Sequence, residues 1–244
     1  MAIKQAKVIT ITSVKGGTGK TTLTLALAGL LSQKNKKTII VDMDLHTGVI
    51  APSLNLKYDK DFYTLTSDIM NHQFKTLENY TLHYNEYIDV LPAPKDPRNV
   101  AKIATSYIDI ILKKLKYLYD VILIDTNHII DNINLVTYDN SDNIIYVLNH
   151  DLMALKNMKT MLAIYDDMKL SKYTLVLNSI FNDTNIQKKD ITDYLGVHIN
   201  YVISKNFYEK KLTSCLMKGK IFNLEKQYQK ENSILNKLLD DILK

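Results

Sequence analysis

The chain has 244 residues, a length that fits one α/β domain with a large core or at most two small domains. Hydrophobic residues make up 46% and charged residues 23%, which is typical of a soluble globular protein. The single cysteine, Cys215, excludes a disulfide framework and a CxxC cluster site within one chain. The net charge of +5 comes almost entirely from lysine and is a modest hint toward nucleic acid or anionic lipid.

The N-terminal residues Met1–Lys7 are polar and run directly into a strand-like segment, so we expect no signal peptide. No apolar run approaches the roughly 18 residues needed to cross a bilayer. We therefore expect a cytoplasmic protein, at most peripheral at the inner face of the membrane or at a cell pole.

Short runs rich in β-branched residues alternate with helical patterns along most of the chain. Most of these runs lack polar/apolar alternation, as expected for strands covered on both faces. The predicted strands are Val8–Val14, Thr38–Asp42, Tyr87–Leu91, Val121–Asp125, Asn143–Leu148, Tyr173–Asn178 and His198–Ile203. The predicted helices are Leu23–Gln33, Thr66–His72, Val100–Tyr117, Leu152–Met168 and Lys188–Leu195. The alternation predicts a single α/β domain over residues 1–244, with a doubly wound, mostly parallel sheet and ligands at the carboxyl ends of its strands.

The segment Ser13–Thr22 reads SVKGGTGKTT and lies between a buried-type strand and an apolar helix, the context that a phosphate loop needs. Its glycines allow successive backbone N–H groups to face one anion, and the following helix adds its positive N-terminal dipole. We expect Lys20 to reach the β- and γ-phosphates, Thr21 to ligate Mg²⁺ and Thr22 to contact the α-phosphate. The predicted nucleotide-binding residues of this loop are Gly16, Gly17, Thr18, Gly19, Lys20, Thr21 and Thr22.

Lys15 is not needed by such a loop, because the glycines and Lys20 already satisfy the phosphates. A second lysine is more useful across a dimer interface, where it would enter the partner's site and neutralise charge developing on the γ-phosphate. The alternative is a solvated loop lysine.

The loop resembles the deviant Walker A motif of the ParA/MinD group of ATPases, which are P-loop NTPases of the SIMIBI type. Ile39–Asp44 resembles the switch I carboxylate motif of that group, and Tyr119–Thr126 resembles Walker B. The resemblance implies slow, Mg²⁺-dependent hydrolysis of ATP by a homodimer with ATP at the interface. It implies that Asp44 orients or activates the attacking water, that Asp125 holds Mg²⁺, and that Asp42 supports Mg²⁺ or the loop.

Four further segments are similar to the CpaE/TadZ branch, whose members localise and help to assemble the secretion machinery of Flp/Tad pili. They are Asp42–Gly48, Val90–Pro94, Asp125–Asp131 and Asp151–Asn157. Asn127 and Met153 depart from this pattern, since the family usually has proline at both positions.

In related ATPases an asparagine at the position of Asn178 binds adenine, and its amide can donate to and accept from the edge of that base. The alternative is an asparagine that caps a turn. The stretch Ile203–Asn206 is a candidate for the other wall of the base pocket.

The C-terminal segment, about residues 224–244, places apolar residues on one stripe from Ile234 to Leu243. We favour a helix that closes the fold over an amphipathic membrane anchor of the MinD kind, because Asp240 and Asp241 would oppose anionic lipid.

These observations favour an ATP-dependent switch that positions or assembles an envelope machine such as a Flp/Tad pilus, with pilus or secretion proteins as partners. The first alternative is a ParA-type partition ATPase that coats DNA, for which a basic face is available at Lys205, Lys210, Lys211, Lys218 and Lys220. A MinD-like placement ATPase on the membrane is the second alternative. A metabolic P-loop ligase has no additional substrate motif to support it, and Tyr228 alone does not make the tyrosine cluster of a bacterial tyrosine kinase.

Overall fold

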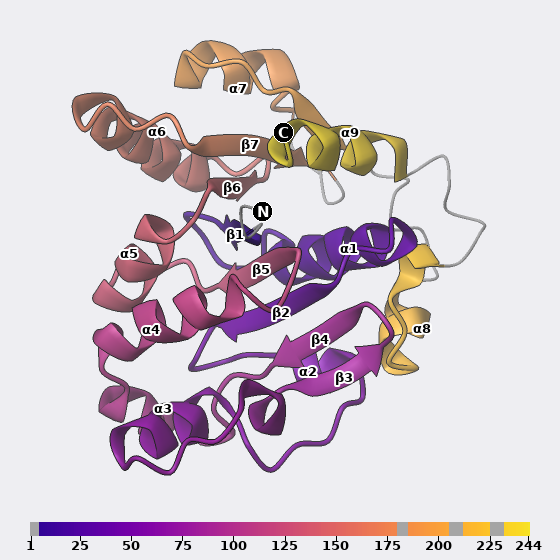
Figure 1. Cartoon of the computed structure of the whole chain (residues 1–244). Helices are drawn as coiled ribbons and strands as arrows, with labels where there is room; N and C mark the ends of the chain where they lie inside the picture. The colour runs from indigo at the N-terminus through magenta and orange to yellow at the C-terminus, as the bar shows by residue number, and fades with distance from the viewer. Residues whose placement is uncertain (1–4, 180–184, 205–211, 225–231) are drawn as a thin grey trace.

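The computed structural model describes residues 5–179, 185–204, 212–224 and 232–244, and these residues form an α/β fold around one central sheet (Figure 1). The sheet has eight strands in the order β3-β4-β2-β5-β1-β6-β7-β8. Every neighbouring pair is parallel except β3 and β4. The strands are β1 (Lys7–Thr12), β2 (Thr38–Met43), β3 (Leu82–Asn85), β4 (Ile88–Leu91), β5 (Val121–Thr126), β6 (Asn143–Leu148), β7 (Tyr173–Asn178) and β8 (Tyr201–Ile203).

Helices cover both faces of this sheet. The α-helices are α1 (Lys20–Gln33), α2 (Ile50–Ser53), α3 (Phe62–Met70), α4 (Thr105–Leu115), α5 (Asn132–Asp139), α6 (Leu152–Asp167), α7 (Lys188–Leu195), α8 (Leu212–Met217) and α9 (Asn232–Ile242). Short 3₁₀ helices lie at Leu77–Tyr80, Pro97–Lys102 and Phe222–Leu224. None of the helices described is both long and apolar enough to span a bilayer.

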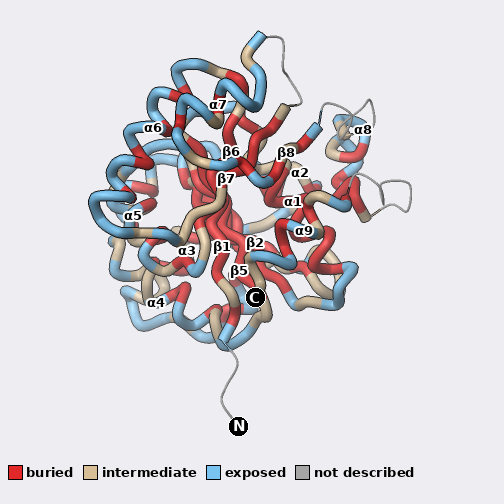
Figure 2. The backbone as a smooth tube through the Cα atoms, turned by 90° about the horizontal axis from the view of Figure 1, so that it is seen from above, coloured by how far each residue is buried: buried red, intermediate tan, exposed pale blue. Residues whose placement is uncertain are grey.

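The core lies on both faces of the sheet, because the central strands are covered on both sides (Figure 2). On one face, residues such as Ile9 and Ile11 pack with α1, α8 and α9. On the other face, Val8 and its neighbours pack with α3 and α4, and the β6–β7 half packs with α6 and α7. The predicted doubly wound, mostly parallel sheet is confirmed, and each predicted strand overlaps an observed one.

Two predicted helices need correction, and helix α5 was not predicted. The predicted helix Val100–Tyr117 is two helices, since Asp96 accepts a hydrogen bond from Arg98 N to start the 3₁₀ turn and extended backbone at Ile103 separates it from α4. The predicted helix Thr66–His72 begins earlier, at Phe62, because the Asp61 side chain caps it through Thr64 N at 2.8 Å. Helix α5, which the periodicity did not predict, begins where the Asp131 side chain accepts from Asn134 N at 2.8 Å.

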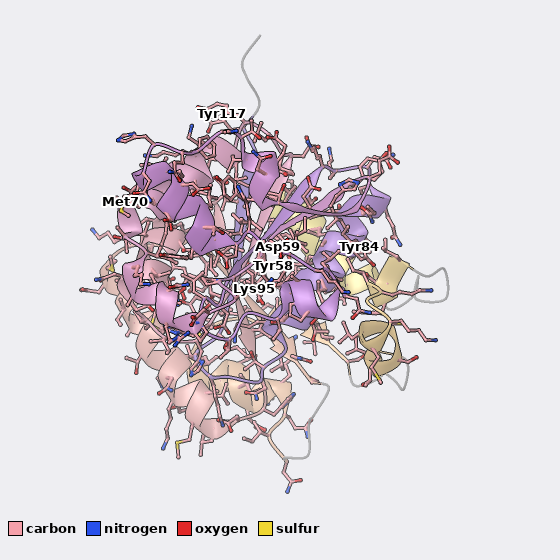
Figure 3. The ribbon with its side chains drawn as sticks, turned by 90° about the horizontal axis from the view of Figure 1, so that it is seen from below. Tyr58, Asp59, Met70, Tyr84, Lys95 and Tyr117 are labelled. Carbon is pink, nitrogen blue, oxygen red and sulfur yellow. The ribbon has the colours of Figure 1, made fainter. Side chains whose placement is uncertain are left out.

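The segment that leads from α2 into α3 is held against the segment that follows β4. Lys95 Nζ lies 5.1 Å from the ring centroid of Tyr58 and 3.6 Å from an Asp59 carboxylate oxygen, and the three side chains lie together in Figure 3. The backbone adds two hydrogen bonds, from Phe62 N to the Pro92 carbonyl and from Lys95 N to the Asp61 carboxylate, both 2.9 Å. The segment after β4 is therefore held against the start of α3.

The described part of the C-terminal segment contains α9, Asn232–Ile242, and residues 225–231 lie outside the described residues. Its Leu235, Leu238 and Leu239 are fully buried and belong to the same core as α1. Lys34 on the α1 side forms an ion pair with Asp240. The apolar stripe of α9 is occupied by the protein's own core, so it does not face lipid in this structure.

Replacing Leu238 with alanine removes a fully buried side chain from the α9–α1 contact. We expect the free energy of unfolding to fall by about 2–5 kcal/mol, as for other buried leucines. The exposed neighbour Lys237→Ala is the matched control and should change it by less than about 0.5 kcal/mol. Urea unfolding followed by circular dichroism measures both; equal values for the two variants would show that α9 is not packed on the core.

Candidate functional site

The order of the central strands brings the chemically important segments to one edge of the sheet. In the parallel register, Ile11 of β1 and Asp42 of β2 both pair with Asp125 of β5. The loop that leaves β1 and the two aspartates therefore emerge next to one another at the carboxyl ends of the strands, where ligands bind in this class of sheet.

The loop between β1 and α1 has the backbone that a phosphate cradle requires. Gly17 and Gly19 have φ values of 74° and 94°, in the left-handed region that favours glycine. Helix α1 begins at Lys20 without a side-chain cap from Gly19, and its first turn holds no acidic residue. The first-turn N–H groups and the helix dipole therefore favour an anion at this end of the helix.

Lys20 lies at the centre of the site and is held by the loop itself. Its Nζ donates to Ser13 Oγ at 3.1 Å, and Ser13 Oγ donates to the Lys15 carbonyl at 2.6 Å. Burial lowers the pKa of Lys20, while the negative charges of Asp125 and Asp44 oppose this shift. The lysine is thus a partly desolvated cation beside two carboxylates.

Thr21 and Asp125 bring two hard oxygen atoms together. Thr21 Oγ1 donates to Asp125 Oδ2 at 2.6 Å, and Thr24 Oγ1 donates to Asp125 Oδ1 at 3.3 Å. Burial raises the pKa of Asp125 to about 6, although the two threonine hydroxyls and Lys20 work against it. A hydroxyl and one carboxylate are a suitable protein donor set for Mg²⁺, which takes its remaining ligands from phosphate and water. These residues therefore fit the metal that the resemblance implies.

Asp42 is 1% exposed, and its carboxylate accepts hydrogen bonds from the backbone of the following loop. Oδ2 accepts from Ile50 N at 3.0 Å and Oδ1 accepts from Asp44 N at 3.3 Å. Burial raises the pKa of Asp42, and the neighbouring Asp125 raises it further. In this arrangement Asp42 organises the loop that carries Asp44.

Asp44 lies at the mouth of β2 and is only half-buried. Its Oδ1 accepts from Thr47 Oγ1 at 2.9 Å and from Thr47 N at 3.3 Å, which fixes the carboxylate in a tight turn. The exposed histidine His46 lies within the same turn. The position of Asp44 beside the Lys20 charge is compatible with the predicted role in orienting water.

Asn178 ends β7 and reaches across to the phosphate loop. Its Nδ2 donates to the Thr18 carbonyl at 2.8 Å, and a Cβ at Gly19 would lie 2.6 Å from the same nitrogen. Gly19 therefore admits the amide to the loop because it lacks a side chain. The buried Thr18 Oγ1 has no hydrogen-bond partner in the structure. The candidate wall at Ile203–Asn206 is described only as far as Ser204, because residues 205–211 lie outside the described part.

A model of the AAA domain family matches residues 6–178, the larger part of the chain. The chain belongs to this AAA domain family. An uncharacterized ATP-binding protein of Methanocaldococcus jannaschii is 23% identical over 212 residues, which cover 86% of this chain and 79% of the relative. A ParA family ATPase from Chlorobium tepidum has a TM-score of 0.83 at 20% identity, covering 97% of this chain and 99% of that chain.

The septum site-determining protein MinD of Pyrococcus horikoshii, solved with Mg-ADP, has a TM-score of 0.79 at 23% identity and covers 97% of this chain and 96% of that chain. These structures share the fold of the AAA domain described here. At these identities the likeness shows the fold, and the family match identifies the AAA domain.

Several contacts of this protein were not predicted from the sequence. Asp151 accepts from Lys15 Nζ at 2.6 Å, although 136 positions separate the two residues. His150 is buried, with ring nitrogens 2.8 Å from the Ile186 carbonyl and from Ser179 Oγ. A local signal existed only for Asp151, which caps α6 through Ala154 N at 2.8 Å as an aspartate before an apolar helix often does. Its contact with Lys15 depends on the order of strands in the sheet.

The amide of Asn178 offers a direct test of its contact with the phosphate loop. In Asn178→Asp a carboxylate oxygen replaces Nδ2 and faces the Thr18 carbonyl, so repulsion replaces a hydrogen bond. We expect ATP to bind at least about tenfold more weakly, with little change in fold, because a buried hydrogen bond of roughly 1–3 kcal/mol is lost. Titration with a fluorescent ATP analogue measures this.

The control is Asn71→Asp on the exposed end of α3, which should leave the affinity unchanged. Unaltered nucleotide binding by Asn178→Asp would show that the bond to Thr18 does not shape the loop.

Proposed function

We propose that the protein is an ATP-dependent dimeric switch that hydrolyses ATP slowly and positions or assembles a cell-envelope machine such as a Flp/Tad pilus. The observation that carries the dimeric part is Lys15. It belongs to the phosphate loop, yet its side chain is 46% exposed and is bound to Asp151 rather than to the loop. A lysine in this position is available to a second subunit.

The Lys15–Asp151 ion pair is a weak restraint. The carboxylate of Asp151 is 30% exposed, and hydrogen bonds from Lys15 and from the α6 backbone lower its pKa. Exposed pairs of this kind contribute about 0–1 kcal/mol. Transfer of Lys15 to the charged phosphates of an ATP molecule in the partner subunit would readily compensate for that loss, because a charge pair at a closed interface is worth about 1.5–7 kcal/mol.

Each residue then has a distinct task in hydrolysis. Lys20 and the first-turn N–H groups of α1 hold the β- and γ-phosphates, and Thr22 contacts the α-phosphate. Thr21 and Asp125 would hold Mg²⁺, with Asp42 supporting this site through the loop that it organises, and the metal would supply charge neutralisation on the phosphates. Asp44 orients the attacking water, and Lys15 of the partner subunit balances charge on the γ-phosphate. Gly16, Gly17, Thr18 and Gly19 shape the cradle, while Asn178 contacts adenine and the cradle together.

The pilus branch is supported by where the four CpaE/TadZ-like segments lie. Gly48 approaches both Asp42 and Ala93 so closely that a Cβ there would lie within 2.6 Å of each side chain. A Cβ at Gly16 would lie 3.7 Å from the ring of His128, and Asp151 holds Lys15. Two of the segments that carry the resemblance therefore contact the phosphate loop, through His128 and Asp151, and the other two contact each other at Gly48 and Ala93.

Asn127 stands where the CpaE/TadZ pattern usually has proline, and its side chain restrains the loop by hydrogen bonds. Its Oδ1 accepts from Ile129 N at 2.8 Å and from Asn134 Nδ2 at 2.7 Å. Side-chain hydrogen bonds thus restrain the backbone where the relatives use a proline ring. Met153, the other departure, is 61% exposed at the start of α6. It leaves an apolar side chain available on this face.

A DNA-coating partition ATPase is the alternative, supported by the likeness to a ParA family ATPase. Lys218 and Lys220 are exposed, as that function requires, while Lys205, Lys210 and Lys211 lie outside the described residues. The MinD-like alternative, a membrane-associated placement ATPase, receives less support because the apolar stripe of α9 is buried.

ATP-dependent dimerisation is tested in a variant that binds ATP but hydrolyses it very slowly. Asp44→Ala should bind ATP but lose the residue that orients water, so hydrolysis should slow by about 10²–10⁴-fold and the dimer should persist. Adding Lys15→Ala should weaken ATP-dependent dimerisation by about a hundredfold or more, because the γ-phosphate loses its partner-subunit cation. Light scattering with and without ATP measures both variants.

Lys57→Ala, an exposed lysine distant from the loop, is the control and should dimerise like the parent. Asp151→Ala releases Lys15 and should tighten the dimer by up to about fivefold, the value of one exposed pair. Normal dimerisation without Lys15, or a monomeric Asp44→Ala variant with ATP, would contradict the proposed mechanism.

Binding of random duplex DNA separates the two main functions. We expect the ATP-bound Asp44→Ala protein to show no strong, salt-sensitive binding in fluorescence anisotropy. A partition ATPase would bind, and its affinity would fall steeply between two salt concentrations because lysines displace counterions from phosphates. Salt-sensitive binding of DNA would contradict the pilus assignment and support the DNA function. If the double variant Lys218→Ala/Lys220→Ala then lost DNA binding, these two lysines would be identified as part of the DNA-binding surface.

A further inference from the structure

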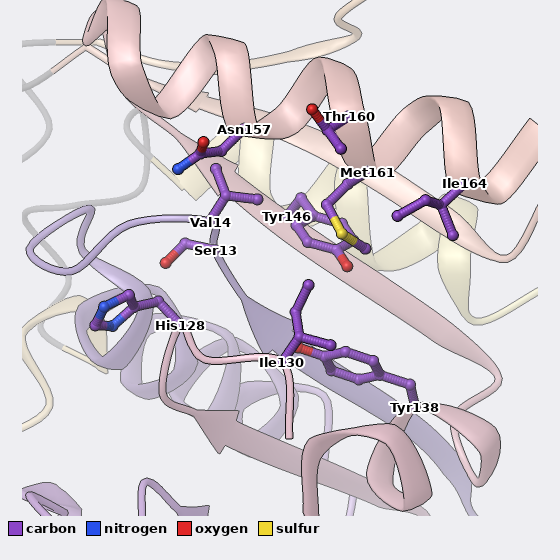
Figure 4. Close-up of a pocket in the computed structure, with 10 residues that line it drawn as sticks. All are labelled: Ser13, Val14, His128, Ile130, Tyr138, Tyr146, Asn157, Thr160, Met161 and Ile164. Carbon is purple, nitrogen blue, oxygen red and sulfur yellow. The ribbon is translucent and has the colours of Figure 1, made fainter. Parts of the chain in front are cut away.

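A cavity of about 320 Å³ lies beside the phosphate loop, between α5 and α6. Figure 4 shows Met161 and Ile164 extending from α6 on one side and Ile130 and Tyr138 on the other. Tyr146 of β6 lies between them. The cavity also reaches the residues at which the chain leaves β1 for the phosphate loop.

The space arises from the way the two helices pack. Helix α5 contacts α4 and helix α6 contacts α7, while Tyr138 of α5 and the buried side chains of α6 belong to one core cluster below the cavity. The loop after β5 does not fill the gap, and its Ile130 is 54% exposed. Ile164 at the opposite side is 44% exposed. The cavity is therefore open to solvent between two apolar side chains.

The polar groups deep in the cavity already have partners within the protein. The Tyr138 hydroxyl lies 2.9 Å from Thr12 Oγ1, and the Tyr146 hydroxyl lies 3.2 Å from the Tyr165 hydroxyl. Ser13 Oγ donates to the Lys15 carbonyl. The two tyrosines thus present mainly ring faces, and burial raises the pKa of Tyr138 to about 12, which keeps its hydroxyl protonated at neutral pH.

The lining has no acidic side chain, lysine or arginine among the residues that the structure describes. The lining also includes the exposed His128 beside the phosphate loop, but the walls formed by α5, α6 and β6 offer no counter-charge to a phosphate or other strongly charged ligand. The nucleotide site is the separate phosphate loop that follows Ser13. Asn157 and Thr160 lie on the exposed face of α6 and add an amide and a hydroxyl. Apolar walls with a few polar groups are typical of sites for small organic molecules, and the volume is at the lower end of their range of about 300–1,000 Å³.

We propose that this cavity is a binding site for a small, uncharged, mainly aromatic or apolar molecule that carries one or two hydrogen-bonding groups. Val14 and Ile130 would contact its apolar part, and Asn157 or Thr160 would bind its polar group. This assignment rests on the lining of the cavity and does not depend on the pilus function.

The position of the cavity couples it to nucleotide. One wall is the start of the phosphate loop, and another is the loop that follows the metal-binding candidate Asp125. A molecule in the cavity restrains both segments, so its affinity differs between the nucleotide-free and Mg·ATP states. By thermodynamic reciprocity, the molecule changes ATP affinity by the same factor.

The test uses 2-naphthol as the probe and the whole chain labelled with ¹³C at its methionine methyl groups. The Met161 methyl resonance, assigned through Met161→Leu, should shift on titration, whereas that of the distant, exposed Met70 should not. Ile164→Trp places a large ring at the mouth of the cavity and should weaken binding by at least about tenfold. The charged analogue 2-naphthoate should bind more weakly than 2-naphthol.

Ile110→Trp is the matched control, because Ile110 is 39% exposed on α4 and Ile164 is 44% exposed on α6. It should bind the probe like the parent. An unmoved Met161 resonance, or equal affinities of parent and Ile164→Trp, would overturn the site. Equal binding of 2-naphthoate would overturn the ligand class, and an affinity unchanged by Mg·ATP would overturn the coupling.

Discussion

The site depends on the parallel register that sets Asp42 of β2 opposite Asp125 of β5. Adjacent strands are about 4.8 Å apart, so two almost fully buried carboxyl groups lie at neighbouring positions in a low-dielectric environment. Burial raises the pKa of both groups, the charge of Asp125 raises the pKa of Asp42 further, and the charge of Asp44 raises the pKa of Asp125. Backbone N–H groups satisfy Asp42, and threonine hydroxyls satisfy Asp125. Because its partners are hydroxyl groups, Asp125 is the carboxylate suited to a cation. The carboxylate of Asp42 instead holds the backbone of the loop that follows β2.

The phosphate loop was predictable because its chemistry is local. Glycines at positions that need positive φ, a lysine at the start of a helix and a buried strand before them all lie within about twenty residues. Asp125 was predictable for a similar reason, since an apolar strand that ends in aspartate places that side chain at the ligand edge of the sheet. Helix α5 and the break before α4 were missed because the side chains of Asp131 and Asp96 set them, against the hydrophobic periodicity.

Contacts between segments that are distant in the sequence could not be predicted from it. These contacts determine the partners of Lys15 and Asn178 in the site. The sequence indicated that Lys15 is unnecessary for its own loop, but the identity of its partner depends on β6 lying next to β1. The same holds for Asn178, whose bond to Thr18 requires β7 to follow β6 in the sheet. Its contact with adenine stays a prediction, and the bond to Thr18 joins the end of β7 to the phosphate loop.

The loop after β5 combines these constraints in a few residues. It follows the end of β5, where the Asp125 carboxylate accepts hydrogen bonds from the phosphate-loop helix, and it ends at Asp131, whose carboxylate caps α5. Between these fixed ends, Asn127 restrains the backbone, His128 faces Gly16, and Ile130 borders the cavity beside α6. Because hydrogen bonds hold both ends, the middle of the loop is the part that is free to respond to a change at Asp125. That middle carries Ile129 and Ile130, two exposed apolar side chains, so a displacement there would change a surface that another molecule can contact.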